Sequence, residues 1–577
     1  MSKAIVTEQY LFDIGDAIRS KVGGSATYKP SQMASAINGI RTISDVVLKG
    51  KTITENGTYN PSSDNADGYS SVVVNISNVF TQEDEGKVVS SGNLVSQTTR
   101  EFTQNGSFDT TLVSNIVVNV QGGGGLDTNY LIAMGASSGV INDSLLPKVG
   151  AYGMANNICI EGFSSPVVKT IESFAFQSCS NLCFVNCDTC TSIGAYAFQS
   201  CSKLLEASFP KCQGIGSNAF MWCFSLSTAY FPECIDIGSY AFWNCNIQSF
   251  NFQSCVTIHE SAFLNCSGFS DFTASKCTTI GNNAFGSCTN LQIVSFPACV
   301  SIGGQAFYGC TSLTTVSFPS CEVIGYNAFL NDSKLQSAIF PEVYNIGYSA
   351  FAGCYSLSVI DISKCITIGS SAFNGCSEIK QVNLPSCSMI WTSGFCGCRT
   401  LEEFSLPVCS SIGSGAFLNN FLLKSAILPS CKSVQRAAFL QCYSLSYVSL
   451  PECTFVGQQA FYKCSSLTEI NIPKVYSTGT NAFQDCINLE TVTLRGYSIA
   501  QNTFINCSKL KTVNVLYSYN GQGASSINSN VFANTPIADS TYLGYFGSIY
   551  VPSELVNYYK SKAGWSFYSD RIAAYEG

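Results

Sequence analysis

Cysteine is the residue type in this chain with the most obvious chemical capacity. There are 30 cysteines among 577 residues, and thiols can form disulfides, ligate metals or act as nucleophiles. None occurs before Cys159 or after Cys507. Twelve lie eight residues before a recurring Phe (the first cysteine column), and fourteen lie three residues after it (the second cysteine column). This spacing predicts that a repeat, and not a catalytic site, places most of the cysteines.

The residues that replace Cys differ between the two columns. Val168, Val343 and Val475 stand in the first column, which predicts a site for a small apolar group. Asp332 and Asn420 stand in the second column, which predicts a position near a polar turn. Equivalent cysteines in adjacent coils would lie about 5 Å apart, one strand spacing, which permits a disulfide. We expect buried free thiols, with scattered disulfides or a metal site as the alternatives. A metal site is disfavoured because a ladder of equivalent cysteines, in a chain with one His, offers no tetrahedral cluster of ligands.

Other signals for catalysis are weak. His259, the single histidine, stands where most coils carry Gly, so we interpret it as a tolerated variant, with a functional group as the alternative. Glu402 and Glu403 are adjacent on an expected strand and would point to opposite faces. The sequence contains no G-x-S-x-G, P-loop or H-E-x-x-H motif, and the run Gly122 to Gly125 has no following Lys-Ser/Thr. We therefore predict no enzyme, no catalytic residue, no metal and no cofactor.

Charge and hydropathy restrict the partners. Charged residues make up 11% of the chain, against about 25% in a typical domain, and the net charge is −8. With no basic patch, we expect no binding to nucleic acid. No stretch of about 18 apolar residues could cross a membrane, and Glu8, Asp13 and Asp16 interrupt any secretory apolar segment. We expect a soluble chain made in a reducing cytosol, without membrane insertion.

The element that positions these residues is a block of 22 residues that recurs about sixteen times. A fixed period of this length predicts a solenoid, in which each coil buries its apolar side against its neighbours. Function should then lie on the faces and ends. The best coils read Leu-x-x-Val-x-Phe-Pro-x-Cys-x-x-Ile-Gly-x-x-Ala-Phe-x-x-Cys-x-x, and the Phe that follows Ala is the anchor: Phe176, Phe198, Phe220, Phe242, Phe263, Phe285, Phe307, Phe329, Phe351, Phe373, Phe395, Phe417, Phe439, Phe461, Phe483 and Phe504.

Each conserved letter of the block has a physical role. Leu-x-x-Val-x-Phe has the spacing of a short strand in a parallel sheet, and Pro ends that strand in ten coils because it has no N–H to donate. Ile-Gly predicts a buried Ile and then a bend where a side chain would crowd the next coil. The Ala-Phe pair predicts a stacked aromatic column, worth about 0.5–1.5 kcal/mol per ring pair beyond area burial.

The chain ahead of the repeat has different chemistry. Residues 1–42 contain two short helical stripes, which we predict dock to another protein or to copies of themselves; packing on the next segment is the alternative. Residues 43–121 form two small β modules with tight turns at Asn56-Gly57 and Asn105-Gly106. Residues 122–160 are predicted to be a Gly-rich linker that covers the first coils of a solenoid spanning 161–516.

Residues 517–577 are predicted to cap the last coil. Ser553 is a suitable N-cap for a helix over 554–563 that Gly564 closes, with Trp565, Phe567 and Tyr568 packing behind it. Solenoids need such a cap to keep water from their last coil, although a tyrosine-rich adhesive tip is an alternative.

The coil motif resembles the BspA-like class of bacterial leucine-rich repeats over residues 161–516, and Ile549 to Val556 with Trp565 is similar to the segment that ends such repeats. This resemblance implies a β-rich leucine-rich repeat solenoid that adheres to cell surfaces. Separately, Tyr28 to Ile37, the Thr-Glu-Asn-Gly-Thr-Tyr unit and Glu85-Gly-Lys-Val-Val resemble segments of phage and prophage tail and baseplate proteins. Together they imply a tail-associated receptor-binding protein in a virion, docked to a tail or baseplate protein through its N-terminus and attached to a glycan or protein on the host cell surface.

Two sets of residues are candidate ligand contacts. Aromatic residues interrupt the early coils where neighbouring coils carry Gln, Ser or Asn, and sugar rings stack on such faces. Small polar residues occupy the middle exposed strand position in most coils. Solvation of the sheet is the alternative explanation for the polar residues, and packing against 126–160 is the alternative for the aromatic residues. The candidates are Trp222, Phe224, Tyr230, Tyr240, Trp243, Ser295, Ser317 and Asn383.

Two other functions stay open at this stage. A bacterial cell-surface adhesin would carry an export signal or anchor, and a structural tail spacer would bind nothing. Homo-oligomers are common among tail fibres, but no heptad pattern supports one here.

Overall fold

The computed structural model describes residues 2–4, 43–48, 51–53, 69–76, 87–90, 93–96, 113–120, 139–143, 147–158, 160–516, 525–539 and 546–575. The predicted helices within 1–42, both Asn-Gly turns and the run Gly122 to Gly125 lie outside these residues. The chain divides into two compact units. The first comprises Met1–Phe269 with Thr273–Lys276, and the second comprises Ser270–Phe272 with Cys277–Gly577.

The first unit begins with strands from the segment predicted as β modules. The valine-rich strands β4 and β7 are parallel neighbours, β4 also pairs antiparallel with β1 and β2, and β5 and β6 form a separate antiparallel pair. Strand β7 then pairs in parallel with β8, which continues the sheet toward the coils. The bounds are β1 (Ser2–Ala4), β2 (Ile43–Leu48), β3 (Lys51–Ile53), β4 (Tyr69–Ile76), β5 (Lys87–Ser90), β6 (Asn93–Ser96), β7 (Val113–Val120) and β8 (Gly139–Asp143).

Each coil of the first unit contributes one longer strand and one two-residue strand, each parallel to its counterpart in the next coil. Ala207 lies opposite Ala229, for example, which is 22 residues further along the chain. The longer strands are β10 (Ile160–Ser165), β12 (Phe184–Cys187), β14 (Glu206–Ser208), β16 (Thr228–Tyr230) and β18 (Ser249–Asn251). The two-residue strands are β9 (Lys148–Val149), β11 (Thr170–Ile171), β13 (Ser192–Ile193), β15 (Gly214–Ile215), β17 (Asp236–Ile237) and β19 (Thr257–Ile258).

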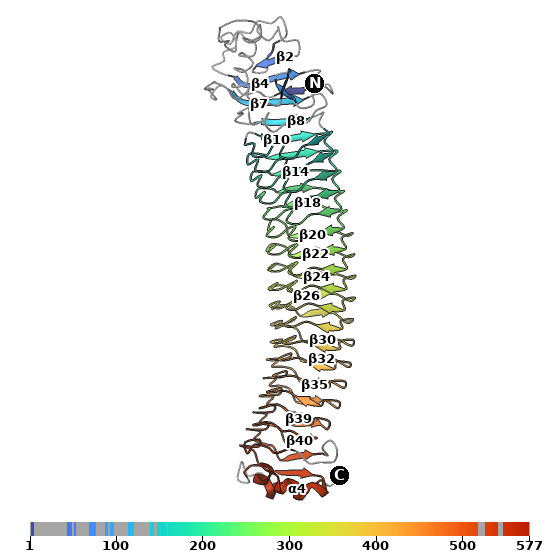
Figure 1. The fold of residues 1–577 in the computed structure, drawn as a ribbon, viewed down its shortest axis with the longest axis vertical. Coiled ribbons are helices and arrows are strands. Elements are labelled where there is room, and N and C mark those ends of the chain that lie inside the picture. The colour runs from blue at the N-terminus through green and yellow to red at the C-terminus, as the bar shows by residue number, and fades with distance from the viewer. Residues whose placement is uncertain are drawn as a thin grey trace. The chain divides into compact units, whose positions relative to one another are not determined.

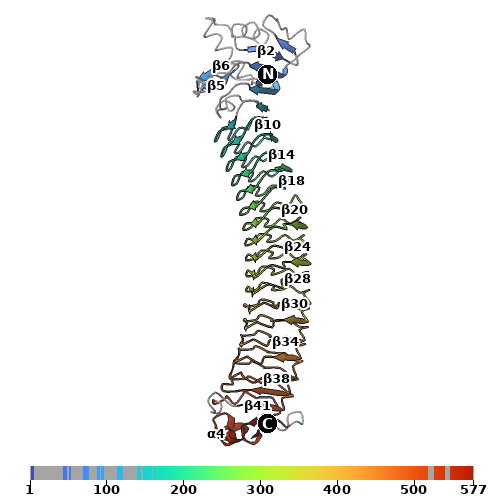
Figure 2. The ribbon, with the colours of Figure 1, turned by 90° about the vertical axis from the view of Figure 1, so that its right-hand side faces the viewer.

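The second unit repeats this arrangement, as the regular stack of coils from β22 to β40 shows (Figure 1). In the view turned by 90°, β24, β28, β34 and β38 follow one side of these coils (Figure 2). The longer strands are β20 (Asp271–Thr273), β22 (Ile293–Ser295), β24 (Thr315–Ser317), β26 (Ser337–Ile339), β28 (Val359–Asp361), β30 (Gln381–Asn383), β32 (Glu403–Ser405), β34 (Ser425–Ile427), β36 (Tyr447–Ser449), β38 (Glu469–Ile472), β40 (Thr491–Leu494) and β41 (Thr512–Val515).

Most two-residue strands of the second unit end on the Ile of the Ile-Gly pair, and β35, β37 and β39 end on Val434, Val456 and Thr478 at the same position. This residue therefore closes a strand as well as filling the core. They form one uninterrupted ladder, whereas the longer strands split into separate sheets. Their bounds are β21 (Thr279–Ile280), β23 (Ser301–Ile302), β25 (Val323–Ile324), β27 (Asn345–Ile346), β29 (Thr367–Ile368), β31 (Met389–Ile390), β33 (Ser411–Ile412), β35 (Ser433–Val434), β37 (Phe455–Val456) and β39 (Ser477–Thr478).

The anchor Phe forms the stacked column that the sequence predicts. In the second unit Phe329 and Phe351 are fully buried, with ring centroids 5.0 Å apart and planes 6° apart. The column extends beyond the sixteen anchors read from the sequence. Met154 occupies the Phe position in the first unit, where its N–H donates to Ala175 O, and Phe532 stacks on Phe504 at 5.6 Å. The chain is therefore a parallel β-solenoid of about 19 turns.

The Gly of the Ile-Gly pair is confirmed as a position of close backbone approach. A Cβ on Gly347 would lie 2.6 Å from the backbone carbon of Gly325, and one on Gly238 would lie 2.7 Å from that of Gly216. Both contacts are to the preceding coil, not to the next coil as predicted. Adjacent coils can therefore approach closely here only with small residues, or with local adjustment where Trp391 or Gln435 replaces Gly.

The C-terminal segment is helical, but less so than predicted. Its elements are β42 (Ser548–Val551), a 3₁₀ turn η7 (Ser553–Leu555), α4 (Val556–Ser561), a second 3₁₀ segment η8 (Trp565–Arg571) and β43 (Ile572–Ala574). Ser553 is not the N-cap that was predicted, because the N-cap of η7 is Pro552 and that of α4 is Leu555. The Ser553 hydroxyl donates to the Glu554 carboxylate. The C-cap of α4 is Lys562, so the prediction that Gly564 closes this helix was wrong; Gly564, with φ of +83°, is the N-cap of η8. Trp565 and Tyr568 are buried. Phe567 is 71% exposed, so the prediction that it packs behind the helix was wrong.

Candidate functional site

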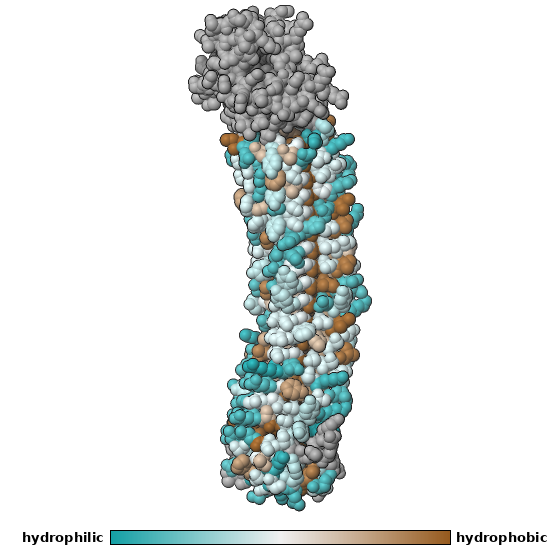
Figure 3. Space-filling model, in the orientation of Figure 1, coloured by the Kyte–Doolittle hydropathy of each residue, from teal (hydrophilic) through white to brown (hydrophobic). Residues whose placement is uncertain are grey.

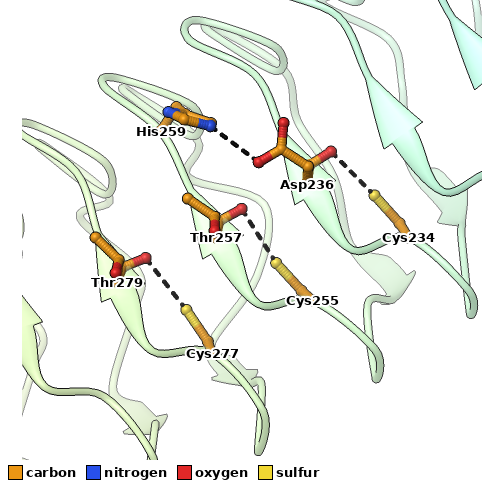
Figure 4. A network of polar contacts seen from close by, with 7 residues as sticks. All are labelled: Cys234, Asp236, Cys255, Thr257, His259, Cys277 and Thr279. Atoms are coloured by element: carbon orange, nitrogen blue, oxygen red, sulfur yellow. Dashed lines mark hydrogen bonds and ion pairs between the residues drawn. The ribbon is translucent and has the colours of Figure 1, made fainter.

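The first cysteine column lies beside the two-residue strands. Each of its thiols donates to the carbonyl oxygen two residues further on, as Cys365 does to Thr367 O at 3.3 Å. Cys234, Cys255 and Cys277 make the same contact at 3.4–3.5 Å (Figure 4). Burial raises the pKa of Cys190 to about 11 and that of Cys321 to about 12. These thiols are therefore neutral hydrogen-bond donors at physiological pH.

The second cysteine column is buried in the core, and its thiols contact the preceding coil. Cys376 donates to the carbonyl oxygen of Phe351, the anchor of that coil, at 3.1 Å, and Cys223 donates to Phe198 O at 3.1 Å. The prediction of a polar turn was wrong, because these side chains have no exposed surface. Asn420, which replaces Cys in this column, donates to Phe395 O in the same way at 3.0 Å.

Both columns consist of thiols, as predicted for buried free cysteines. Among the 29 cysteines that the structure describes, 27 are buried, and Cys183 and Cys396 are partly exposed. Burial raises the pKa of Cys376 well above its usual range. Because the thiolate is the reactive form, thiols of this kind are chemically inert. Within the described residues, no group of three His, Cys, Asp or Glu side chains could hold a metal ion.

His259 lies on the surface of the first unit. Its Nε2 is 2.9 Å from Oδ1 of Asp236, and both side chains are about half exposed (Figure 4). The pair bridges β17 and the residue after β19, which are neighbouring strands. An exposed pair of this kind contributes little to stability, and no nucleophile contacts it in the described contacts. The arrangement fits the interpretation of His259 as a variant of the Gly position.

Three of the predicted aromatic residues come together in the first unit and are called the aromatic cluster: Trp222, Tyr240 and Trp243. The Trp222 and Trp243 rings are 5.7 Å apart with planes tilted by 45°, and Tyr240 lies 5.6 Å from Trp243 at 59°. The Tyr240 hydroxyl donates to Glu260 Oε1 at 3.4 Å. The tilted rings do not cover each other face to face, and all three side chains are partly exposed.

Backbone conformation distinguishes this cluster. Trp222 has φ of +63° and Tyr240 has φ of +58°, in the left-handed region that Asn, Ser and Gly occupy in other coils. Each coil from the one at Met154 to the one at Phe504 places one such residue two positions before the anchor position and one two positions after it, as Asn327 and Asn331 do around Phe329. Left-handed conformation costs a residue with a Cβ roughly 1–2 kcal/mol, least for Asn. The sequence analysis did not identify these positions, although the Asn, Ser and Gly enrichment was a signal for them.

Phe224 and Tyr230 do not join the aromatic cluster. Phe224 is 57% exposed in the turn after its anchor, and Tyr230 is 44% exposed at the end of β16, where it lies opposite Ser208 and Asn251. No described ring contact links either residue to the cluster. All five aromatic candidates depart from the repeat, but only the three residues of the aromatic cluster contact one another in the described ring contacts.

The polar candidates lie on the longer strands of the second unit. Ser295 on β22 is opposite Ser317 on β24, and both are exposed. Asn383 on β30 is exposed and opposite Ser405 on β32. Apolar residues interrupt this column, as at Ile427, which is 52% exposed. Most of the visible surface of the coils is polar or weakly polar, with hydrophobic residues in narrow lines along it (Figure 3).

Two other aromatic arrangements were missed by the sequence analysis. Tyr152, Phe174 and Tyr196 form a parallel stack in the first unit, with centroids 4.7 and 4.8 Å apart and planes 2° apart. Tyr326 and Tyr348 stack at 5.3 Å in the second unit, and the Tyr326 ring occupies the space that a Cβ on Gly304 would need. Their 22-residue spacing was the available signal.

Solved structures of leucine-rich repeat proteins are similar to parts of this chain. A leucine-rich repeat protein from Bacteroides ovatus is 26% identical over 63% of this chain and 87% of its own, with a TM-score of 0.41. A leucine rich cell surface protein from Faecalibacterium prausnitzii is 22% identical over 53% of this chain and 83% of its own, with a TM-score of 0.30. A leucine-rich repeat protein of T. pallidum is 27% identical over 33% of this chain and 72% of its own, with a TM-score of 0.22.

No curated protein matches the chain. None of the helices in the described part of the chain is both long and apolar enough to cross a membrane. The profile of the BspA type leucine rich repeat region matches residues 148–270, 256–367, 322–446 and 432–550, which together cover more than half of the chain. These matches span the coils of both units, with their stacked anchor Phe and buried thiols. The chain therefore belongs to the BspA type leucine-rich repeat family.

Proposed function

We propose that this protein is a non-enzymatic adhesin that binds a glycan on a cell surface through the aromatic cluster of the first unit. The observation that carries the proposal is the presence of Trp222 and Tyr240 at left-handed positions. The repeat is satisfied there by Ser or Asn, as at Ser200 and Asn218. Folding does not call for large rings at these positions, so we infer that they serve recognition.

The orientation of the rings supports a glycan as the ligand. Sugar rings stack through their C–H faces on the faces of aromatic rings, and Trp and Tyr are prominent in binding hot spots. In the stack of Tyr152, Phe174 and Tyr196 each inner face is covered by the next ring. In the aromatic cluster the tilt of 45° between the two tryptophans avoids this coverage. The Glu260 carboxylate beside the Tyr240 hydroxyl adds a hydrogen-bond acceptor for sugar hydroxyls.

A variant that restores the repeat tests this proposal. Trp222→Asn, Tyr240→Asn and Trp243→Gln together introduce the residues found at the same positions as Asn244, Asn218 and Gln199. Two left-handed aromatic residues are removed, so the variant should fold at least as stably as the natural protein. We expect its binding to target cells, measured by flow cytometry with the purified full chain, to fall at least tenfold.

A matched control removes exposed aromatic surface elsewhere. Tyr326→Ser with Tyr348→Ser deletes the exposed pair of the second unit and introduces the residue of Ser217 and Ser370 in the same column. Binding should be unchanged in this control. Equal binding by the natural protein and the repeat-restoring variant would refute the aromatic cluster as the site. Binding that survives removal of surface glycans by glycosidases, yet is lost in the variant, would indicate a protein ligand.

The setting of the adhesin is a separate question. The resemblance of the N-terminal segments to phage tail and baseplate proteins predicts a virion tail, docked through residues 1–42, and this stays a prediction. The matched repeat region begins at residue 148, after these segments. A bacterial cell surface is the alternative location and fits the family equally. Antibodies against residues 161–516 should label either purified virions or intact bacteria, and labelling of bacteria alone would exclude the tail setting.

A further inference from the structure

Asp332 is an unusual member of the second cysteine column. It lies three residues after the anchor Phe329, in the second unit, and its side chain is 0% exposed. Cys310 and Cys354 hold the same position in the preceding and following coils, and both are fully buried. An acidic side chain is therefore enclosed in a column of neutral thiols.

The neighbouring members show what this position contributes. Cys310 donates to Phe285 O at 3.1 Å, Cys354 donates to Phe329 O at 3.0 Å, and the Nδ2 of Asn420 donates to Phe395 O at 3.0 Å. Each side chain therefore supplies a proton to the anchor carbonyl of the preceding coil. A carboxylate has no proton to donate, whereas a carboxylic acid has one.

The surroundings of Asp332 offer no compensation for a negative charge. Neither carboxyl oxygen has a hydrogen-bond partner. The titratable groups that face it are the Cys310 and Cys354 thiols, and the charge on Asp332 would interact unfavourably with both thiolates. Lys334, two residues further on, is exposed. Burial raises the pKa of Asp332 well above its usual range, and the Cys310 N–H, which donates to Phe307 O at 3.1 Å, offsets little of that.

We propose that Asp332 is held as a neutral carboxylic acid that donates its proton to the Phe307 carbonyl oxygen, which makes its coil an acid-stabilised, alkali-sensitive element of the second unit. Phe307 is the anchor of the preceding coil, so this contact reproduces the one that Cys and Asn make elsewhere in the column. An unfolded Asp has a pKa of about 3.9. Because the folded state retains the proton to higher pH, stability is fully present below about pH 4 and decreases as pH rises toward the folded pKa.

Reciprocal exchange within the column tests the proposal. Asp332→Asn supplies an amide donor that does not titrate, as Asn420 does in its own coil. The urea midpoint of the full chain, followed by circular dichroism, should match the natural protein near pH 4 and exceed it at pH 8. Asn420→Asp should lower the midpoint at pH 8 and leave it close to that of the natural protein near pH 4.

Two results would overturn the proposal. One is the same pH dependence in the natural protein and in Asp332→Asn. The other comes from infrared spectroscopy, which needs no variant that might fail to fold: a buried neutral acid gives a protonated-carboxyl band at pH 7 that is lost in Asp332→Asn. Absence of that band from the natural protein would show that Asp332 is ionised.

Discussion

The two units use different residues where their backbones adopt the left-handed conformation. Two positions before the anchor, the first unit carries four aromatic residues, Tyr152, Phe174, Tyr196 and Tyr240, beside Asn218 and Ser261. At the same position the second unit carries Asn, Gln, Ser, Gly or Ala, from Asn283 onward. The anchors and thiols of both units are alike in burial and in hydrogen bonding. The core residues are therefore the same throughout the solenoid, whereas the residues at the left-handed surface positions vary between the units.

The largest effect should come from the core that the units share. Phe220→Ala in the first unit and Phe373→Ala in the second each remove a fully buried ring that stacks on both neighbours. We expect a loss of about 3–5 kcal/mol in each case, from lost transfer energy and the remaining cavity. Urea unfolding monitored by circular dichroism measures it. A small loss in one unit alone would show that the cores are not equivalent.

A smaller loss of stability should distinguish substitutions in the two cysteine columns of the second unit. Cys376→Val removes the S–H donor to Phe351 O, although the Cys354 N–H still donates to that oxygen at 3.2 Å. We expect destabilisation of about 0.5–1.5 kcal/mol. Cys365→Val should be nearly neutral, because Val343 and Val475 already occupy that column. Equal losses in the two variants, again by urea unfolding, would mean that the hydrogen bond to the anchor carbonyl is unimportant.

The smallest change in stability should come from exchanging Tyr and Asn two positions before the anchor, and its sign should be opposite in the two units. Tyr240→Asn relieves a left-handed aromatic residue in the first unit and should stabilise it by up to about 1 kcal/mol. Asn327→Tyr makes the opposite change at the same position of the second unit and should destabilise it by a similar amount. Differential scanning calorimetry would detect both shifts. Destabilisation by Tyr240→Asn would assign the ring a structural role.

Much of the fold was predictable because each residue pattern recurs in many coils, so the same structural inference rests on many copies. A buried Ile before Gly, a stacked anchor Phe and a first cysteine column tolerant of Val are all direct consequences of coils that must stack. The second cysteine column was misinterpreted, because Asp332 and Asn420 look like turn residues when burial is unknown. The carbonyl partner of Asn420 is Phe395 O, 25 residues earlier in the chain, and no local pattern reveals such a contact.

The sequence predicted that the candidate site contains aromatic residues, but not which of them contact one another. Five aromatic residues were candidates because they depart from the repeat. In the structure, the stacking of coils brings only Trp222, Tyr240 and Trp243 into contact. Phe224 and Tyr230 occupy other positions of the 22-residue coil. Aromatic rings come into contact when they occupy the same turn in adjacent coils. Which residues share a turn depends on where the backbone of the coil bends.

The sequence by itself determined the period, the apolar core and the thiol columns, because a side chain that recurs at every coil must meet its own copies. The tertiary structure decided the left-handed conformation of Trp222 and Tyr240, the burial of Asp332 and the hydrogen bonds that Cys and Asn of its column donate to the preceding coil. The physical reason is that these properties depend on the backbone of the neighbouring coil. That backbone supplies the carbonyl groups, excludes water and sets which rings approach one another.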